Sequence, residues 1–132
     1  MIFVDTSIWI SYFRGADLSL IAKLNTLLDE DRVALAAPVW LELLSGVKNS
    51  ESGMLRRVLS ALPRYYPVLD TWKKLDDWIG EGLKKGQRFG SMDLLIACIV
   101  KQEEGHLWSL DADFARMAKL RFVELYTRRR MR

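Results

Sequence analysis

Short apolar runs alternate with longer segments of helical periodicity along this chain. The runs occupy residues 1–4, 33–37, 65–69, 106–110 and 121–125. A short apolar run is typical of a strand buried on both faces, as in a parallel sheet whose connections are helices. The alternation therefore predicts an α/β fold: a three-layer α/β/α sandwich around a parallel sheet of about five strands.

The segments between these runs predict the helices. One begins near Thr6, and the others cover residues 18–28, 38–46, 54–62, 72–83, 91–103 and 112–119. Pro38 suits a first helical turn, Ser91 suits an N-cap, and Pro67 assigns the run 65–69 to the sheet edge. The almost unbroken apolar sequence of 91–103 predicts a central, buried helix. With 132 residues, 50% of them hydrophobic, we expect a single domain over residues 1–132.

Composition excludes several classes of protein. No apolar stretch reaches the roughly eighteen residues of a membrane span, and the N-terminus lacks a charged-then-apolar signal pattern, so we expect a cytoplasmic protein without a membrane partner. Cys98 is the single cysteine and lies in the apolar run 94–100. It can neither form an internal disulfide nor belong to a thiolate cluster, and it is expected to pack in the core.

The formal net charge of +3 is unevenly distributed. Basic residues gather in the connector after residue 83 and at the C-terminus: Lys84, Lys85, Arg88, Arg128, Arg129, Arg130 and Arg132. Such clusters suit a polyanion or an acidic partner. For the terminal arginines, a solubilising role is the alternative.

Four carboxylates lie just after a predicted strand or in the opening turns of a predicted helix: Asp5, Glu42, Asp93 and Asp111. In a parallel α/β sheet the strand ends and the helix starts share one edge, so these acids are expected to converge there. Crowded carboxylates repel one another, and a divalent cation is one of the usual remedies. Hard oxygen ligands favour Mg2+ or Mn2+.

Each acid taken singly has a structural explanation as well. Asp5 and Asp111 could cap helices, Asp93 could interact with a helix dipole, and Glu42 could be a solvated surface residue. The functional prediction therefore depends on the joint pattern.

Other chemistries find little support. The single histidine, His106, starts a strand at the edge opposite the acids, and the sequence has no serine nucleophile elbow, phosphate loop or dinucleotide fingerprint. The sequence DTS at residues 5–7 lacks the second aspartate of an aspartyl-phosphate phosphatase. A metal-activated water is then the plausible nucleophile, with a phosphodiester as the substrate. An acid-phosphatase-like hydrolase of small phosphoesters is a weaker alternative.

Four sequence motifs resemble those of the PIN domain and, more narrowly, of VapC-type toxins of type II toxin–antitoxin pairs. They are FVDTS at 3–7, WLELLSG at 40–46, SMDLLIA at 91–97 and SLDADF at 109–114. Each motif is weak alone, but their order and spacing are specific, and the resemblance covers essentially the full chain. Ser109 is a departure, since the family more often has threonine there, although the hydroxyl is retained.

The resemblance implies a Mg2+- or Mn2+-dependent endoribonuclease. Asp5 and Asp93 would be the main metal ligands, and Glu42 and Asp111 would complete the acidic pocket. Asp111 is preferred to its neighbour Asp113 because it comes first after the strand. Substrate contacts are assigned to Thr6, Ser109, Lys84, Lys85 and Arg88. The resemblance also implies a homodimer that is neutralised by a small cognate antitoxin.

A non-catalytic PIN-like module that binds RNA or a protein partner is the alternative from another class. The intact set of acids argues against it, because concentrated negative charge disfavours the binding of a polyanion.

Overall fold

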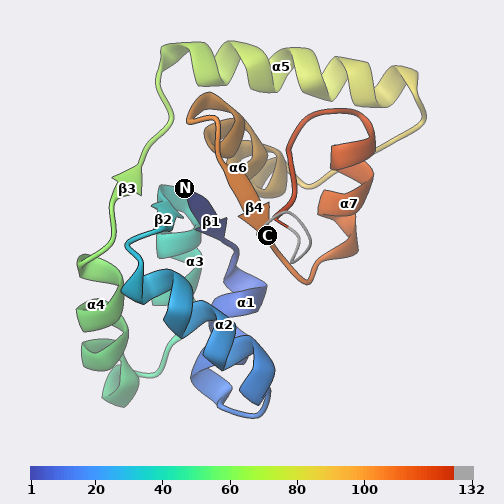
Figure 1. Cartoon of the computed structure of the whole chain (residues 1–132). Helices are drawn as coiled ribbons and strands as arrows, with labels where there is room; N and C mark the ends of the chain where they lie inside the picture. The colour runs from blue at the N-terminus through green and yellow to red at the C-terminus, as the bar shows by residue number, and fades with distance from the viewer. Residues whose placement is uncertain (127–132) are drawn as a thin grey trace.

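The computed structural model describes residues 1–126, and the terminal arginines, predicted to suit a polyanion or an acidic partner, lie outside this range. Its strands are β1 (Ile2–Val4), β2 (Val33–Ala36), β3 (Arg64–Tyr65) and β4 (His106–Trp108). They form one parallel sheet in the order β3-β2-β1-β4 (Figure 1). Phe3 pairs with Ala34 on one side and with Leu107 on the other, so β1 is central. The predicted parallel α/β sheet is confirmed, with four strands within the described residues.

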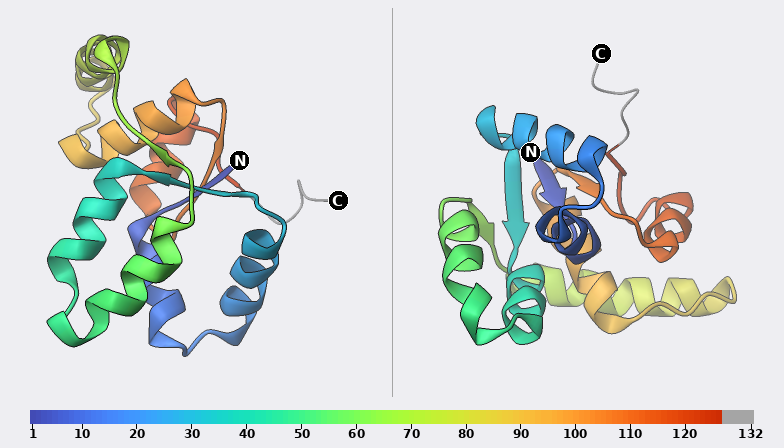
Figure 2. Two further views of the ribbon diagram at one scale, coloured as in Figure 1. Left: turned by 90° about the vertical axis from the view of Figure 1, so that its left-hand side faces the viewer. Right: turned by 90° about the horizontal axis from the view of Figure 1, so that it is seen from below.

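The helices are α1 (Thr6–Arg14), α2 (Leu18–Asp29), α3 (Ala37–Gly46), α4 (Ser52–Ser60), α5 (Leu69–Lys84), α6 (Ser91–Gln102) and α7 (Ala112–Lys119), with a 3-10 turn, η1 (Asn49–Glu51), before α4. In Figure 1 and in the left view of Figure 2, α1, α2, α3 and α4 lie on one side of the sheet, and α5 and α6 lie on the other. This arrangement is the predicted three-layer sandwich. No helix in residues 1–126 is long and apolar enough to cross a membrane.

The predicted fifth strand, residues 121–125, is reduced to a single bridge. Leu125 pairs with Leu107, and the flanking bonds are Leu107 N–H to the Glu124 carbonyl at 2.9 Å and Tyr126 N–H to the Leu107 carbonyl at 2.8 Å. Arg121 has φ 64°, in the left-handed region, because it forms the turn that closes α7. Within residues 1–126, the chain therefore pairs with β4 only from Glu124 onward.

The predicted strand 65–69 overlaps the observed strand only at Tyr65, so its bounds were wrong. Strand β3 ends at Tyr65, and α5 begins at Leu69, three residues before the predicted helix start at 72. Thr71 explains the early start, since its Oγ1 accepts a hydrogen bond of 2.9 Å from the Val68 N–H and thus caps the helix. Ser91 was also misassigned: Gly90 is the N-cap of α6, and Ser91 is the first helical residue.

The core lies between the sheet and its helices and contains all three residues of β1. Helix α6 buries Leu94 and residues 96–100, as its apolar sequence predicted. Cys98 is 1% exposed, and burial raises the pKa of its thiol to about 12, so this cysteine is a packing residue. Trp78 of α5 stacks on Phe122 at 4.3 Å between ring centroids, which attaches α5 to the body of the protein.

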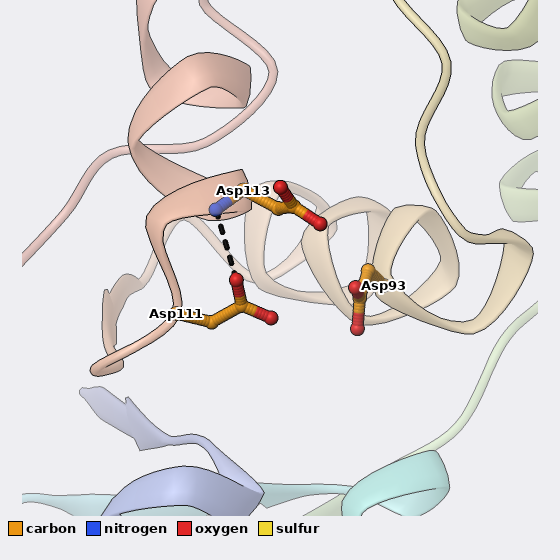
Figure 3. A group of neighbouring side chains, drawn as sticks. All are labelled: Asp93, Asp111 and Asp113. Carbon is orange, nitrogen blue, oxygen red and sulfur yellow. Dashed lines mark hydrogen bonds between the residues drawn. The ribbon is translucent and has the colours of Figure 1, made fainter.

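Parallel strand pairing places the carboxyl ends of β1, β2 and β4 at one edge of the sheet. Helices α1, α3 and α7 begin there, each within a few residues of a strand end. The N-terminal turn of α6 lies beside that of α7 (Figure 3). The sequence positions of the four acids therefore translate into one edge of the molecule.

Candidate metal centre

Three carboxylates face one another at this edge (Figure 3). Asp93 from α6 and Asp111 and Asp113 from the start of α7 each place a carboxylate oxygen within 4.8 Å of the other two. Asp93 and Asp113 are partly buried, and Asp111 is exposed. The structure thus brings Asp93 and Asp111 together as expected, and it adds Asp113, which the sequence had offered only as a substitute for Asp111.

Local helix chemistry holds the two acids of α7. Asp111 is the N-cap of α7, and its Oδ1 accepts a hydrogen bond of 2.9 Å from the Asp113 N–H. This is the structural explanation that the sequence left open, and the cap leaves the other oxygen of Asp111 available. Asp93 lies in the first turn of α6. All three acids therefore benefit from the positive end of a helix dipole.

The electrostatics of the edge converge on Asp93. Its pKa is raised to about 6, first by burial and then by the charges of Asp111, Asp5, Glu42 and Asp113. The charges of the other three predicted acids therefore all reach Asp93, although the carboxylate oxygens of Asp5 and Glu42 are not part of the three-residue group. A carboxylate whose ionised form is destabilised by burial and by neighbouring charges is a candidate for binding a cation.

Asp5 is 5% exposed and is held by hydroxyl groups. Its Oδ2 accepts hydrogen bonds from Ser7 Oγ at 2.9 Å and from Ser109 Oγ at 2.7 Å, and it also caps α1 through the Ser7 N–H. These donors stabilise the ionised carboxylate without a positive charge. One oxygen of Asp5 is thus committed to the protein, which leaves Oδ1 as its available ligand atom.

Ser7 is a residue that sequence reasoning missed. Its Oγ bonds Asp5 and also accepts a hydrogen bond of 3.0 Å from the Leu110 N–H, so it joins the end of β1 to the segment after β4. Ser109 makes a parallel link, because its Oγ accepts from the Asp111 N–H at 3.0 Å. Their 102-residue separation hides this pairing from the sequence.

Glu42 is exposed on α3 and accepts a hydrogen bond of 2.7 Å from Thr6 Oγ1 on α1. The hydroxyl groups of Thr6 and Ser109, both predicted to contact substrate, are therefore directed at acids of the site. Substrate contact by these two residues stays a prediction.

Comparison with known proteins gives the family of this chain. The sequence model described as "PIN domain" matches residues 2–120. The chain belongs to the PIN domain family. Its curated relatives include VapC ribonuclease Mb1587 of Mycobacterium bovis and ribonuclease VapC11 of Mycobacterium tuberculosis, each 29% identical over 129 residues, with 91% of this chain and 93% of the relative covered.

Solved structures support the fold. A VapBC2 complex from Rickettsia felis, bound to a promoter DNA fragment, has a chain that matches this PIN domain with a TM-score of 0.77 and 23% identity, covering 96% of this chain and 98% of the other. VapBC-1 of nontypeable Haemophilus influenzae matches with a TM-score of 0.73 and 22% identity, covering 96% and 97%. The resemblance to the PIN domain is therefore confirmed, with relatives that are VapC ribonucleases.

The acids of this PIN domain fit a small divalent cation. Octahedral ligands at about 2.1 Å lie at most about 4.2 Å apart, so oxygens within 4.8 Å need only a small inward shift. The donors are carboxylates without thiol or imidazole, which is the chemistry that Mg2+ and Mn2+ prefer. The raised pKa of Asp93 indicates that the acids repel one another, and a bound cation would relieve this repulsion.

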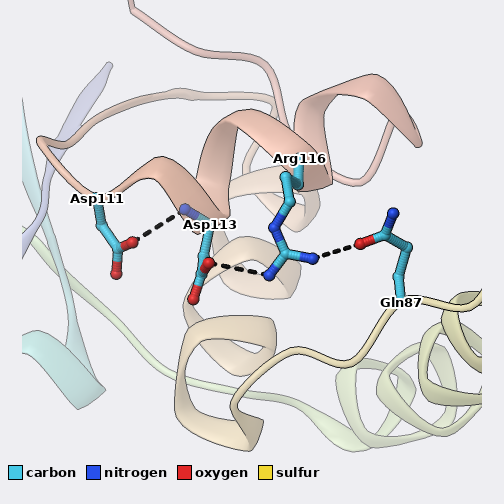
Figure 4. A network of polar contacts seen from close by, with 4 residues as sticks. All are labelled: Gln87, Asp111, Asp113 and Arg116. Atoms are coloured by element: carbon cyan, nitrogen blue, oxygen red, sulfur yellow. Dashed lines mark hydrogen bonds and ion pairs between the residues drawn. The ribbon is translucent and has the colours of Figure 1, made fainter.

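Arg116 is a second residue that sequence reasoning missed (Figure 4). It forms an ion pair of 2.9 Å with Asp113 Oδ1 and donates a hydrogen bond to Gln87 Oε1. The spacing of three residues between Asp113 and Arg116 on a helix was a signal that could have revealed the pair.

The predicted RNA contacts Lys84, Lys85 and Arg88 are exposed at the end of α5 and in the connector that follows. Lys85 pairs with Glu81 at 3.8 Å on the surface. Through Gln87 and Arg116 this connector reaches the acids of α7. Contact of these three basic residues with RNA stays a prediction.

Proposed function

We propose that this PIN domain is a Mg2+- or Mn2+-dependent endoribonuclease and the toxin of a type II toxin–antitoxin pair. The observation that carries the proposal is the group of Asp93, Asp111 and Asp113, whose carboxylate oxygens lie within 4.8 Å of one another on an edge that also holds Asp5 and Glu42. The similarity to VapC ribonucleases supplies the substrate class. We place the activity in the cytoplasm, where the RNA is.

In this proposal Asp5 and Asp93 are the main cation ligands, and Asp111 and Glu42 complete the pocket. A bound divalent cation supplies positive charge for the phosphodiester and lowers the pKa of a water nucleophile. The chain's own groups orient the ligands: Ser7 and Ser109 fix Asp5, and Thr6 fixes Glu42. Fixed ligands matter because a displacement of about 1 Å can cost about 100-fold in rate.

The negative edge repels a polyanionic substrate, so RNA needs cationic contacts nearby. We assign these to Lys84, Lys85 and Arg88, which are exposed in the connector before α6. Phosphate contacts of this kind confer affinity without sequence preference.

We also propose a homodimer and a cognate antitoxin as partners. The solved relatives are described as VapBC complexes, which supports a protein partner. Helix α5 exposes Leu69, Trp72, Ile79 and Leu83, and their 3-7-4 spacing forms one apolar stripe along its outer face. A stripe of this kind suits a second helix, and we assign it to the partner copy.

The test is cleavage of a labelled RNA with Mg2+ or Mn2+ and with a chelator. We expect cleavage that depends on the metal, and a loss of at least about 100-fold in Asp93→Asn, because the amide keeps the shape but removes the charge that holds the cation. Asp77→Asn, an exposed acid on α5, is the matched control and should keep full activity.

Other outcomes would support the alternatives. RNA binding without cleavage at any metal concentration would indicate a binding module. Hydrolysis of a small aryl phosphate in preference to RNA would indicate a phosphatase. Full RNA cleavage by a folded Asp93→Asn protein would contradict the assigned site.

A further inference from the structure

Arg116 connects the two helices that carry the three-carboxylate group. Its guanidinium pairs with Asp113 Oδ1 at 2.9 Å and donates to Gln87 Oε1 (Figure 4). It also lies over the ring of Phe89, 4.6 Å from the ring centroid. Asp113 is on α7, whereas Gln87 and Phe89 belong to the connector that leads into α6. Phe89 directly precedes Gly90, the N-cap of α6. Arg116 therefore holds the start of α6, which carries Asp93, next to the start of α7, which carries Asp113.

Arg116 also makes the two acids of α7 unequal. Asp111 and Asp113 each place a carboxylate oxygen within 4.8 Å of one from Asp93, but their partners differ. Asp111 Oδ1 accepts from a neutral backbone N–H, whereas Asp113 Oδ1 accepts from a guanidinium. The charge of Asp113 is thus offset locally, and its free oxygen attracts a cation less strongly than that of Asp111.

We propose that Arg116 is a positioning residue that offsets the charge of Asp113 and so makes Asp111 the acid of α7 that binds the divalent cation. This inference rests on the proposed metal-dependent nuclease activity. It also gives a physical reason for the preference between the two acids, which the sequence could justify only by order along the chain.

Removal of Arg116 should change metal affinity and turnover in opposite directions. Arg116→Met keeps the aliphatic stem but frees the full charge of Asp113, so the pocket should bind Mn2+ more tightly, by about 3- to 10-fold. Asp113 would then compete with Asp111 as a cation ligand. We expect kcat to fall about 10-fold or more, because the productive geometry is lost. KM for RNA should change less than kcat.

The experiment measures Mn2+ binding by titration calorimetry or by the electron paramagnetic resonance signal of the free ion, without RNA, alongside RNA turnover. Lys119→Met, an exposed basic residue one turn further along α7, is the matched control and should leave both quantities near wild type. Arg116→Lys should retain near-normal Mn2+ affinity and recover part of kcat, since it keeps the charge but not the fork that binds Asp113 and Gln87 together.

The double variant Arg116→Met with Asp113→Asn tests whether the effect of Arg116 on Mn2+ affinity acts through Asp113. If the freed carboxylate causes the tighter binding, then its removal should return Mn2+ affinity to near the wild-type value. A purely structural role for Arg116 would instead weaken Mn2+ binding and would not be corrected by Asp113→Asn. Thermal melts without metal identify any variant that fails to fold. If Arg116→Met is such a variant, Arg116→Gln, which also removes the charge, carries the test with the same expected results.

The outcomes separate this inference from the proposed function. Tighter Mn2+ binding with lower kcat in Arg116→Met, reversed in affinity by Asp113→Asn, supports it. Unchanged or weaker Mn2+ binding in folded Arg116→Met overturns it while leaving the nuclease proposal intact. A wild-type protein that neither binds Mn2+ nor cleaves RNA overturns both.

Discussion

Burial and the repulsion between carboxylates destabilise the ionised form of Asp93 in the absence of a cation. Burial and four neighbouring carboxylates raise its pKa from 3.8 to about 6, so the folded protein holds this proton more tightly than the unfolded chain does. A native pKa above the unfolded value contributes stability that is full below pH of about 4 and is lost as the pH rises through about 6. The ionised site at neutral pH is therefore a local source of instability.

Without divalent metal, Asp93→Asn should be more stable than the wild type at pH 7 by roughly 2 kcal/mol, after allowance for solvent screening. The difference should shrink to near zero at pH 4, where both side chains are neutral. Urea unfolding at several pH values measures it, with Asp77→Asn on α5 as the control. A wild type that gains stability over Asp93→Asn between pH 4 and pH 7 would contradict the electrostatic description.

At the scale of elements, the helices that carry the acids are fixed by close contact with the sheet. The turn between α6 and β4 passes directly over β1 at Gly105. A Cβ at this position would lie 2.6 and 2.7 Å from two ring carbons of Phe3 and 3.2 Å from the Met1 carbonyl oxygen. Phe3 is 1% exposed and has no space into which to move. Glycine is required here because the buried ring of Phe3 occupies the space that a Cβ would need, not because of a left-handed φ.

Gly105→Ala should therefore destabilise the fold by about 1–3 kcal/mol, the usual range for an overpacked core. The control is Gly80→Ala in the exposed interior of α5, where a Cβ meets nothing within 4 Å and alanine should stabilise the helix by up to about 1 kcal/mol. Urea midpoints of the two variants give opposite shifts if this reasoning holds. An unchanged midpoint in Gly105→Ala would show that β1 and the turn can separate at little cost.

For the whole molecule, α5 is the part that the monomer leaves least covered. Its inner face packs Leu75 and Trp78 against the body, while Leu69 is 73% exposed and Trp72 is 51% exposed on the outer face. Exposed apolar residues are common on proteins, but a stripe along one long helix marks an interaction surface. In the proposed homodimer this stripe is buried.

We therefore expect Leu83→Glu on the stripe to weaken self-association at least 10-fold, because the charge would be buried without a partner. Leu18→Glu is the matched control, since Leu18 is 76% exposed at the start of α2 and lies outside the stripe. Sedimentation equilibrium measures both. Equal association constants for Leu83→Glu and the wild type would exclude α5 from the interface, and a strictly monomeric wild type would remove the homodimer from the proposal.

Much of this protein was readable from its sequence because local patterns decide local structure. The apolar runs at β1, β2 and β4 and the helical periods between them predicted the layers, and the buried run of α6 was predicted correctly. The positions of Asp5 and Asp111 after strands placed both acids at one edge. These features depend on short apolar runs, on the helical period of 3.6 residues and on the chain direction, which a sequence carries by itself.

Only the tertiary structure decided the features that depend on distance between remote segments. The bridge at Leu125, the shared hydrogen bonding of Asp5 by Ser7 and Ser109, and the entry of Asp113 into the carboxylate group all arise from segments brought together by folding. Arg116 lies 29 residues after its partner Gln87 and 27 residues after its partner Phe89. The sequence determined which acids reach one edge of the sheet, whereas packing determined which of them touch. Contact energies at about 3 Å depend on side-chain geometry that no one-dimensional pattern encodes.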